Sequence, residues 1–441
     1  MGLPTFKGGI HPYEGKELSE DKPVTVLESK GEMVFPISQH IGSPAIPLVA
    51  PGDRVLTGQK IGEMDGSISS CVISSVSGTV KSVEPRVIAG GSPIMSVVVE
   101  NDQKYETTEN FGTERDPGTL SKEEIRNLIK EAGVVGLGGA GFPTYVKLSP
   151  KDDAAIDTVI VNGAECEPYL TSDYRMMIEN TQEIVKGLHI VLQLFENARG
   201  IIGIEQNKPE AIRRLQELVV DEPRITIVPV KTKYPQGWEK TLIYSVTGRK
   251  VKADMIPAEA GCIVDNVGTM VSIYQAVAKG IPLIWRTITV SGDAILNPGN
   301  YYVRTGTNYQ ELADAAGGFK EKPQKLISGG PMMGQALSDL NIPVTKVSSA
   351  LLGFIEDEKA VQETTACIRC GRCVHVCPGK LVPQQMVIAG RNGDMNRFFK
   401  LNGMDCCECG CCSYVCPAKI PLTETFIQVH RNVSMAGKEK V

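Results

Sequence analysis

Cysteine placement constrains this 441-residue chain more than any other feature, because ten of its 13 cysteines lie between Cys367 and Cys416. The spacing C-x₂-C-x₂-C-x₃-C-P occurs twice in that segment. The cysteines that fit it are Cys367, Cys370, Cys373 and Cys377 in the first run, and Cys406, Cys409, Cys412 and Cys416 in the second. Disulfide-rich secreted chains are short and begin with an apolar leader, whereas this chain is long and begins MGLPTFKGG. The segment is therefore predicted to bind metal.

This spacing is typical of two-cluster ferredoxins, in which the fourth Cys of each run binds the other cluster. It predicts two [4Fe–4S] clusters with crossed ligands. We assign Cys367, Cys370, Cys373 and Cys416 to one cluster, and Cys377, Cys406, Cys409 and Cys412 to the other. Two structural zinc sites are the alternative, but zinc needs only two C-x₂-C pairs, without a third Cys and a Cys-Pro at fixed offsets. Cys407 and Cys411 fall outside the pattern and are expected to pack as small apolar residues.

The overall composition excludes several classes of protein. The net charge is −5 and 42% of the residues are hydrophobic, so we expect a folded chain that does not bind nucleic acid. No window approaches 18 consecutive apolar residues, so any connection to a membrane is expected to run through a partner. The segment from 367 onward holds more Lys and Arg than Asp and Glu. This excess either offsets the negative charge of the clusters or forms a docking face for an acidic redox partner.

The patterning predicts a multidomain α/β chain, of which the first two units cover residues 1–110 and 115–284. Short β-type runs broken by turns predict an N-terminal arm and a β barrel-sandwich module in the first unit. That module resembles lipoyl and biotinyl carriers, but its tip (65–71) has no Lys to modify, so a structural role is expected. Strands alternate with helices in the second unit, which predicts a parallel α/β domain. One long helix is expected near 174–197.

The last two predicted units cover residues 285–345 and 358–430. The former contains a hairpin with an Asn-Pro-Gly turn and then a short helix, and it resembles a β-grasp module of the SLBB type. The latter holds both cysteine runs, and residues 381–399 between them are expected to be helical. It is therefore predicted to be a helical two-cluster domain of the ferredoxin type.

A glycine-rich run, GLGGAGFPTYVKL (136–148), follows the first predicted helix of the α/β unit. Backbone N–H groups in such a loop can approach a phosphate, and Lys147 would add a positive charge. Tight packing is the alternative role for the loop. The run is not G-x-G-x-x-G after a strand, so a standard dinucleotide site of the Rossmann type is not expected.

This run resembles the flavin loop of the NADH-oxidising subunit of respiratory complex I, GRGGAGFPTGLKW. The stretches VNGAECEPY (161–169), YPQGWEKTLIYSVTGR (234–249) and IVDNVGTM (263–270) resemble further motifs of that family, in the same order. The resemblance implies that FMN is held by Gly138, Gly139, Gly141, Lys147, Asn162 and Asn266. It also implies that Glu165 and Glu239 face the nucleotide or the flavin edge, and it matches Glu167 and Gly237 to motif positions.

Two residues depart from that family's motifs on the nucleotide side of the site. Ala164 stands where the family has Asp, and Trp238 stands in place of the first Glu of a Glu-Glu pair. These changes put the details of NADH binding in question more than FMN binding. No nucleophile or acid/base pair is expected, because hydride transfer depends on positioning.

Over nearly its whole length the chain resembles the RnfC-type members of the Rnf ion-translocating ferredoxin:NAD⁺ oxidoreductases. The resemblance implies FMN, NAD(H) and two [4Fe–4S] clusters, with hydride transfer between NAD(H) and FMN and then single-electron transfer through the clusters. It implies a B-type iron–sulfur subunit, integral membrane subunits and, indirectly, ferredoxin as partners, and a place on the cytoplasmic face of the cell membrane. One alternative is a flavin and iron–sulfur cobalamin reductase of a metabolic microcompartment. The other is an electron-relay subunit that no longer binds nucleotide.

Overall fold

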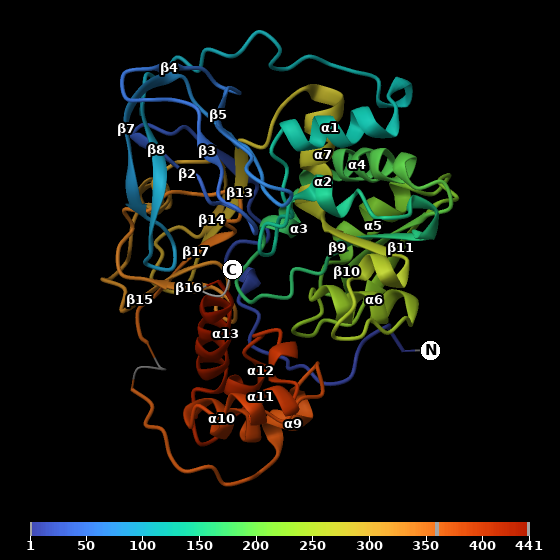
Figure 1. Ribbon diagram of the computed structural model, residues 1–441, viewed down its shortest axis with the longest axis vertical. Coiled ribbons are helices and arrows are strands. Elements are labelled where there is room, and N and C mark those ends of the chain that lie inside the picture. Colours follow the sequence, from blue (N-terminus) through green and yellow to red (C-terminus); the bar gives the residue numbers. More distant parts are fainter. Residues whose placement is uncertain (1, 358–360, 439–441) are drawn as a thin grey trace.

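The computed structural model describes residues 2–357 and 361–438, with side chains up to residue 435 (Figure 1). The first residue of the predicted N-terminal unit and residues 358–360, where the predicted cysteine-rich unit begins, lie outside the described residues. Within the described ranges, no helix is both long enough and apolar enough to cross a membrane.

The N-terminal barrel-sandwich module consists of two small antiparallel sheets around one core. Their strand orders are β2-β8-β7-β4 and β3-β5-β6. Met33 and Phe35 from the first sheet are buried in the same core as Ile61 and Val72 from the second. The strands are β2 (Glu32–Pro36), β3 (Ile46–Pro47), β4 (Arg54–Val55), β5 (Lys60–Glu63), β6 (Val72–Ile73), β7 (Gly78–Val87) and β8 (Pro93–Asn101).

The α/β unit has a parallel sheet in the order β11-β10-β9-β12 with helices on both faces (Figure 1). Val159 and Ile202 pack in one core with Leu188 of α4. Ile160, one residue further along its strand, packs with Leu242 of α6 on the opposite face. Such alternation along parallel strands buries both faces of the sheet. The elements are α1 (Lys122–Glu131), α2 (Thr144–Lys147), β9 (Thr158–Gly163), α3 (Ser172–Glu179), α4 (Thr181–Leu194), β10 (Arg199–Glu205), α5 (Pro209–Leu218), β11 (Ile225–Val230), α6 (Glu239–Thr247), β12 (Cys262–Asn266) and α7 (Val267–Lys279).

The single helix expected near 174–197 is wrong, because two helices occupy this segment. The chain leaves the helical conformation at Asn180, where φ is −113° and ψ is 27°. The Thr181 hydroxyl donates to the carbonyl of Met177 at 2.7 Å, so a side chain satisfies an acceptor at the end of α3. The hydrophobic period runs across this break and therefore did not reveal it.

The β-grasp unit is a six-stranded mixed sheet with the order β1-β14-β13-β17-β15-β16. The predicted hairpin is formed by β13 and β14, which pair antiparallel. The edge strand β1 pairs with β14 in parallel, so residues close to the N-terminus belong to this sheet. The elements are β1 (Val24–Leu27), β13 (Trp285–Ser291), β14 (Gly299–Arg304), α8 (Tyr309–Ala315), β15 (Lys325–Ser328), β16 (Gln335–Leu337) and β17 (Ala350–Phe354).

The cysteine-rich unit is helical, and it lies at the lower end of the molecule in Figure 1. Its core contains Phe398 and Phe426 together with several cysteines. The helix expected over 381–399 is broken at Gly393, where φ is +67°, a conformation that glycine adopts at little cost. The helices are α9 (Arg372–Val376), α10 (Pro383–Arg391), α11 (Met395–Lys400), α12 (Cys411–Tyr414) and α13 (Leu422–Lys438).

Helices α4 and α7 approach so closely that Gly187→Ala is expected to destabilise the fold. A Cβ atom at Gly187 would lie 2.0 Å from the carbonyl oxygen of Met270. Helix propensity alone favours alanine by about 1 kcal/mol, but overpacking costs about 1–3 kcal/mol. Urea unfolding is expected to show a net loss of stability for Gly187→Ala and little change for Gln193→Ala, at an exposed position of the same helix. A stabilised Gly187→Ala protein would contradict this packing.

Candidate functional site

The glycine-rich loop lies against the carboxyl end of β12. The Leu137 N–H donates to the Thr269 hydroxyl at 3.0 Å. Gly138 has φ +76°, and a Cβ atom there would lie 2.8 Å from Asn266 Nδ2. Nothing lies within 4 Å of the corresponding position at Gly139. In the part of the chain that the structure describes, the N–H groups of Gly138, Gly139 and Ala140 have no protein acceptor, which is the arrangement of an anion-binding cradle.

Gly141 packs differently from the other predicted glycines of this loop. Its φ is +73°, and a Cβ atom there would lie 2.6 Å from Val347 and 3.2 Å from the Gln39 carbonyl oxygen. Its own carbonyl accepts a hydrogen bond from the Ile41 N–H at 3.3 Å. Gly141 therefore anchors the loop to the barrel-sandwich module.

Lys147 and Asp265 supply opposite charges beside the cradle. Lys147 Nζ donates to the Val264 carbonyl at 2.7 Å and lies 3.2 Å from Asp265 Oδ1. The Asp265 side chain is fully buried, and its oxygens accept no hydrogen bond of good geometry from the described residues. Burial raises its pKa, and Lys147 opposes that shift. Because buried carboxylates are normally hydrogen-bonded, Asp265 is suited to accept hydroxyl donors of a ligand such as the ribityl chain of FMN.

Asp265 was not predicted from the sequence. It precedes Asn266 at the end of a strand, and a charged residue within an apolar run is the signal that could have identified it.

The two predicted asparagines organise the strand ends. Asn162 Nδ2 donates to the Gly237 carbonyl at 2.8 Å, which joins the end of β9 to the loop before α6. Asn266 caps α7 by accepting from the Gly268 N–H at 2.7 Å, and its Nδ2 donates to Asp173 at 2.6 Å. The two asparagines lie side by side at the ends of neighbouring strands.

Glu165 caps a helix. Its carboxylate accepts from the N–H groups of Asp173 at 2.7 Å and Tyr174 at 3.2 Å, in the first turn of α3. Burial raises its pKa to about 7, while the charge of Lys16 opposes that shift. The Glu165 side chain therefore stabilises the start of α3.

Glu167 connects the α/β unit to the β-grasp unit. Its carboxylate accepts from the Met332 N–H at 3.1 Å and lies 3.5 Å from the Tyr234 hydroxyl. A Cβ atom at Gly330 would lie 2.1 Å from the Glu167 carboxylate, so only glycine fits there. Burial raises the pKa of Glu167 to about 7.

Glu239 is the predicted acid that remains free for a ligand. It is the first residue of α6 and half-buried, and no described residue hydrogen-bonds or ion-pairs with its side chain. The two residues that depart from the family motifs differ in exposure. Ala164 is fully buried, whereas Trp238, next to Glu239 in the sequence, is half-buried.

The two cysteine runs have matching backbone conformations. Each turns through the left-handed region at the same three positions, and a short helix, α9 or α12, follows the glycine. The matched pairs are Arg369 and Glu408 (φ 56° and 55°), Gly371 and Gly410 (75° and 77°), and Lys380 and Lys419 (59° and 52°). The repeat seen in the cysteine spacing is therefore also a structural repeat.

Thiols of the two cysteine runs lie close to one another, and five of them belong to one core. Burial raises the pKa of Cys373, and Cys416 is the thiol whose charge adds to that shift. Burial likewise raises the pKa of Cys406, and the neighbouring thiols that add to it are Cys412, Cys409 and Cys377. None of the 13 cysteines is in a disulfide. Among the described residues, no three His, Cys, Asp or Glu side chains meet at distances that would bind a metal ion.

Comparison with known proteins identifies the units. Residues 4–104 match the RnfC barrel sandwich hybrid domain, residues 129–275 match the Nuo51 FMN-binding domain, and residues 287–336 match the SLBB domain. The chain is 43% identical over 389 residues to the RnfC-type component of the proton-translocating ferredoxin:NAD⁺ oxidoreductase complex of Clostridium ljungdahlii, covering 88% of this chain and 85% of that protein.

It is also 41% identical over 404 residues to the corresponding component of the Na⁺-translocating ferredoxin:NAD⁺ oxidoreductase complex of Acetobacterium woodii, covering 91% and 90%. The chain belongs to the RnfC family. The family and the fold types predicted for the first three units are thereby confirmed. An NAD⁺-reducing [NiFe]-hydrogenase in its H₂-reduced state shares the fold, with a TM-score of 0.50 and 19% identity over 68% of this chain and 60% of that chain.

The raised pKa of Glu167 predicts how stability depends on pH. A carboxyl group whose pKa is about 7 in the fold and near 4.5 when unfolded stabilises the protein fully below pH 4.5, and that contribution is lost as pH rises through 7. Glu167→Gln removes this contribution. The melting temperature of the wild type minus that of Glu167→Gln is therefore expected to be larger at pH 5 than at pH 8. Glu109→Gln changes an exposed position, and its difference from the wild type should not follow this trend. A pH-independent difference for Glu167→Gln would contradict the assignment.

Proposed function

We propose that this chain is the NAD(H)-reactive subunit of a membrane-bound, ion-translocating ferredoxin:NAD⁺ oxidoreductase. A hydride passes between NAD(H) and FMN, and single electrons pass through two [4Fe–4S] clusters to partner subunits. The observation that carries this proposal is that a cradle of free backbone N–H groups, beside a buried carboxylate paired with Lys147, shares one chain with a repeated thiol-rich domain. FMN supplies the exchange between a two-electron hydride and single electrons.

Different residues around the cradle suit different parts of FMN. The free N–H groups of Gly138, Gly139 and Ala140 and the ammonium group of Lys147 suit the phosphate. Asp265 suits the ribityl hydroxyls, and Asn162 and Gly237 form the facing wall. Glu239 remains available to the nicotinamide nucleotide, which favours a nucleotide-binding subunit over an electron relay that has lost this ability.

The grouping of the thiols supports the crossed ligation of the two clusters. Cys416 neighbours Cys373 of the first run, and Cys377 neighbours the thiols of the second run. The Leu381 N–H donates to Cys377 Sγ and the Glu408 N–H to Cys406 Sγ, each at 3.4 Å. Such N–H···S bonds stabilise thiolate ligands.

The assembly that we propose places the chain on the cytoplasmic face of the cell membrane through partner subunits. These are a B-type iron–sulfur subunit and integral membrane subunits, with ferredoxin reached indirectly. The four units proposed for the chain cover residues 1–110, 115–284, 285–345 and 358–430, and β1 and β17, which lie outside 285–345, add strands to the sheet of the third unit.

The central test is anaerobic titration of the purified chain with NADH. About eight irons per chain, matching sulfide and one FMN are expected, and NADH should bleach the flavin absorbance. Cobalamin reduction and reduction of a B-type subunit are assayed in parallel. Bound FMN that NADH does not bleach would refute the proposal, and reduction of cob(III)alamin alone would favour the cobalamin reductase.

Lys147 provides a test of the flavin site. Lys147→Met removes one charge-assisted bond, worth about 1.5–3 kcal/mol, so the dissociation constant of FMN is expected to rise about tenfold or more. Lys151→Met changes a nearby exposed lysine and should bind FMN as the wild type does. Flavin fluorescence quenching measures both constants, and equal constants would exclude Lys147 from the site.

A further inference from the structure

The flavin-binding unit and the cysteine-rich unit meet at one buried, sulfur-rich junction. Tyr234, 1% exposed, packs with Ile10, Cys409 and Cys411, and Cys166 lies at the edge of this cluster. The Cys411 thiol donates weakly to the Tyr234 carbonyl at 3.9 Å. Two thiols that lie outside the ligand pattern, Cys166 and Cys411, therefore line the contact between the units.

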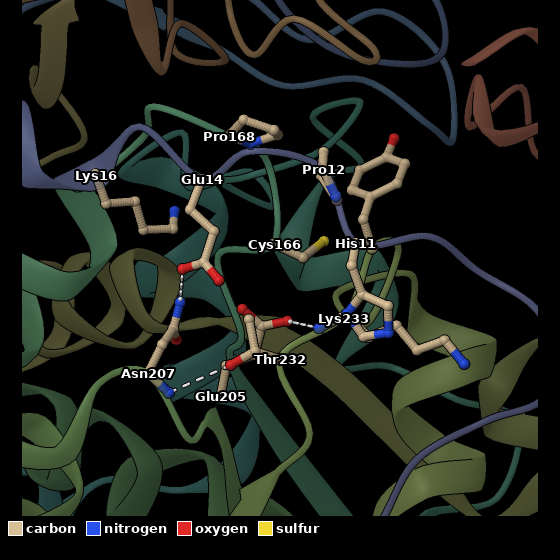
Figure 2. Close-up of a pocket in the computed structure, with 11 residues that line it drawn as sticks. His11, Pro12, Glu14, Lys16, Cys166, Pro168, Glu205, Asn207, Thr232 and Lys233 are labelled. Carbon is tan, nitrogen blue, oxygen red and sulfur yellow. Dashed lines mark hydrogen bonds between the residues drawn. The ribbon is translucent and has the colours of Figure 1, made fainter. Parts of the chain in front are cut away.

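The junction is continuous with the flavin-binding wall. The Gly237 N–H donates to Cys166 Sγ at 3.3 Å, and the Gly237 carbonyl accepts from Asn162. A cavity of about 30 Å³ lies beside Cys166 and Tyr234, and Figure 2 shows hydrogen bonds from Asn207 to Glu14 and Thr232 among its lining residues. Its lining comes from the N-terminal segment, which contributes His11 and Lys16, and from the α/β unit, which contributes Thr232.

The two ligand sets lie differently with respect to this junction. Cys409 belongs to the buried junction cluster, whereas Cys367 and Cys370 of the other set are exposed. The set of Cys377, Cys406, Cys409 and Cys412 thus faces the flavin-binding unit, and the other set opens to the surface.

The N-terminal arm, residues 4–17, fastens this junction. The Gly9 N–H donates to the Val376 carbonyl at 2.7 Å, next to the ligand Cys377. Ile10 and Tyr234 exchange two backbone hydrogen bonds, at 2.8 and 3.0 Å. Gly8, with φ +93°, lies so close that a Cβ atom there would be 2.9 Å from the Cys377 carbonyl oxygen. In Figure 1 the dark blue arm passes between the red unit and the green and yellow unit.

We propose that this junction is the electron entry of the cysteine-rich unit, that the cluster held by Cys377, Cys406, Cys409 and Cys412 is reduced first, and that the N-terminal arm keeps the junction closed. The inference rests on the proposed function. The two electrons of one NADH, which is oxidised to NAD⁺, reduce the two clusters by one electron each, and the proton of the hydride is released to water. Gly8 and Ile10 act here as positioning residues.

The arm is tested with Gly8→Ala in the full chain. An added methyl group should push the arm from Cys377 and widen the junction, and because electron transfer slows as donor and acceptor move apart, we expect cluster reduction by NADH to become severalfold slower. Flavin bleaching by NADH should keep its wild-type rate. Stopped-flow absorbance follows the flavin, and freeze-quench electron paramagnetic resonance follows the reduced clusters.

Gly91→Ala is the matched control, because Gly91 also has a left-handed φ, +77°, but nothing lies within 4 Å of an added Cβ atom. After reduction with dithionite, the number of spins measured by electron paramagnetic resonance should be equal in all variants, which would show that the clusters assemble. If Gly8→Ala does not fold, Ile10→Ala replaces it, with exposed Ile256→Ala as its control. Wild-type cluster reduction in the folded arm variant would overturn the role of the arm.

The order of the clusters is tested with Cys370→Ser, which disables the outer set. NADH should still reduce one cluster in this variant. Reduction by dithionite but not by NADH would make the outer set the first acceptor and overturn the proposal. A wild-type flavin that NADH does not bleach would instead refute the proposed function, so the two failures are distinguishable.

Discussion

The ammonium group of Lys16 is the interaction on which the rest of the site depends. It is buried and donates to the carbonyls of Glu165, Glu167 and Leu170, at 2.9, 3.0 and 2.6 Å. Burial lowers the pKa of Lys16, and the charge of Glu165 opposes that shift. A buried charge is tolerated only when it is paired and hydrogen-bonded, and here one lysine of the arm fixes the loop from 163 to 170 at three points.

That loop connects three parts of the molecule through three consecutive side chains. Glu165 caps α3, Cys166 accepts from Gly237 beside the flavin wall, and Glu167 binds the β-grasp backbone at Met332. Glu165 has φ 47°, in the left-handed region that non-glycine residues seldom adopt. Such a conformation persists only when surrounding contacts impose it, and Lys16 supplies those contacts. The position of Gly237, proposed to border the flavin, is thus tied to the arm that also contacts the cysteine-rich unit.

Local patterns predicted much of this arrangement. The helix predicted before the glycine-rich run is α1, which begins at a capping box of Ser121 and Glu124, and the alternation of strands with helices predicted the parallel sheet. The roles of Lys16 and Tyr234 were not predictable, because a lysine in a Gly- and Pro-rich arm looks solvated until its partners, about 150 residues away, are known. Glu165 was predicted by resemblance to face a ligand, whereas its side chain caps α3. Motif matching finds positions, but only tertiary contacts show which groups remain free.

An anion can bind where backbone N–H groups are not already hydrogen-bonded within the protein. Helices α3 and α7 both begin near the carboxyl end of the sheet, where their N-terminal dipoles favour negative charge. The N–H groups at the start of α3 are satisfied by Glu165, and that of Gly268 in α7 is satisfied by Asn266. The N–H groups of the glycine-rich loop beside Lys147 are free donors at this edge, in the part of the chain that the structure describes. Asn162 and Gly237 connect this edge of the sheet to the sulfur-rich junction, because the Gly237 carbonyl accepts from Asn162 and the Gly237 N–H donates to Cys166 Sγ.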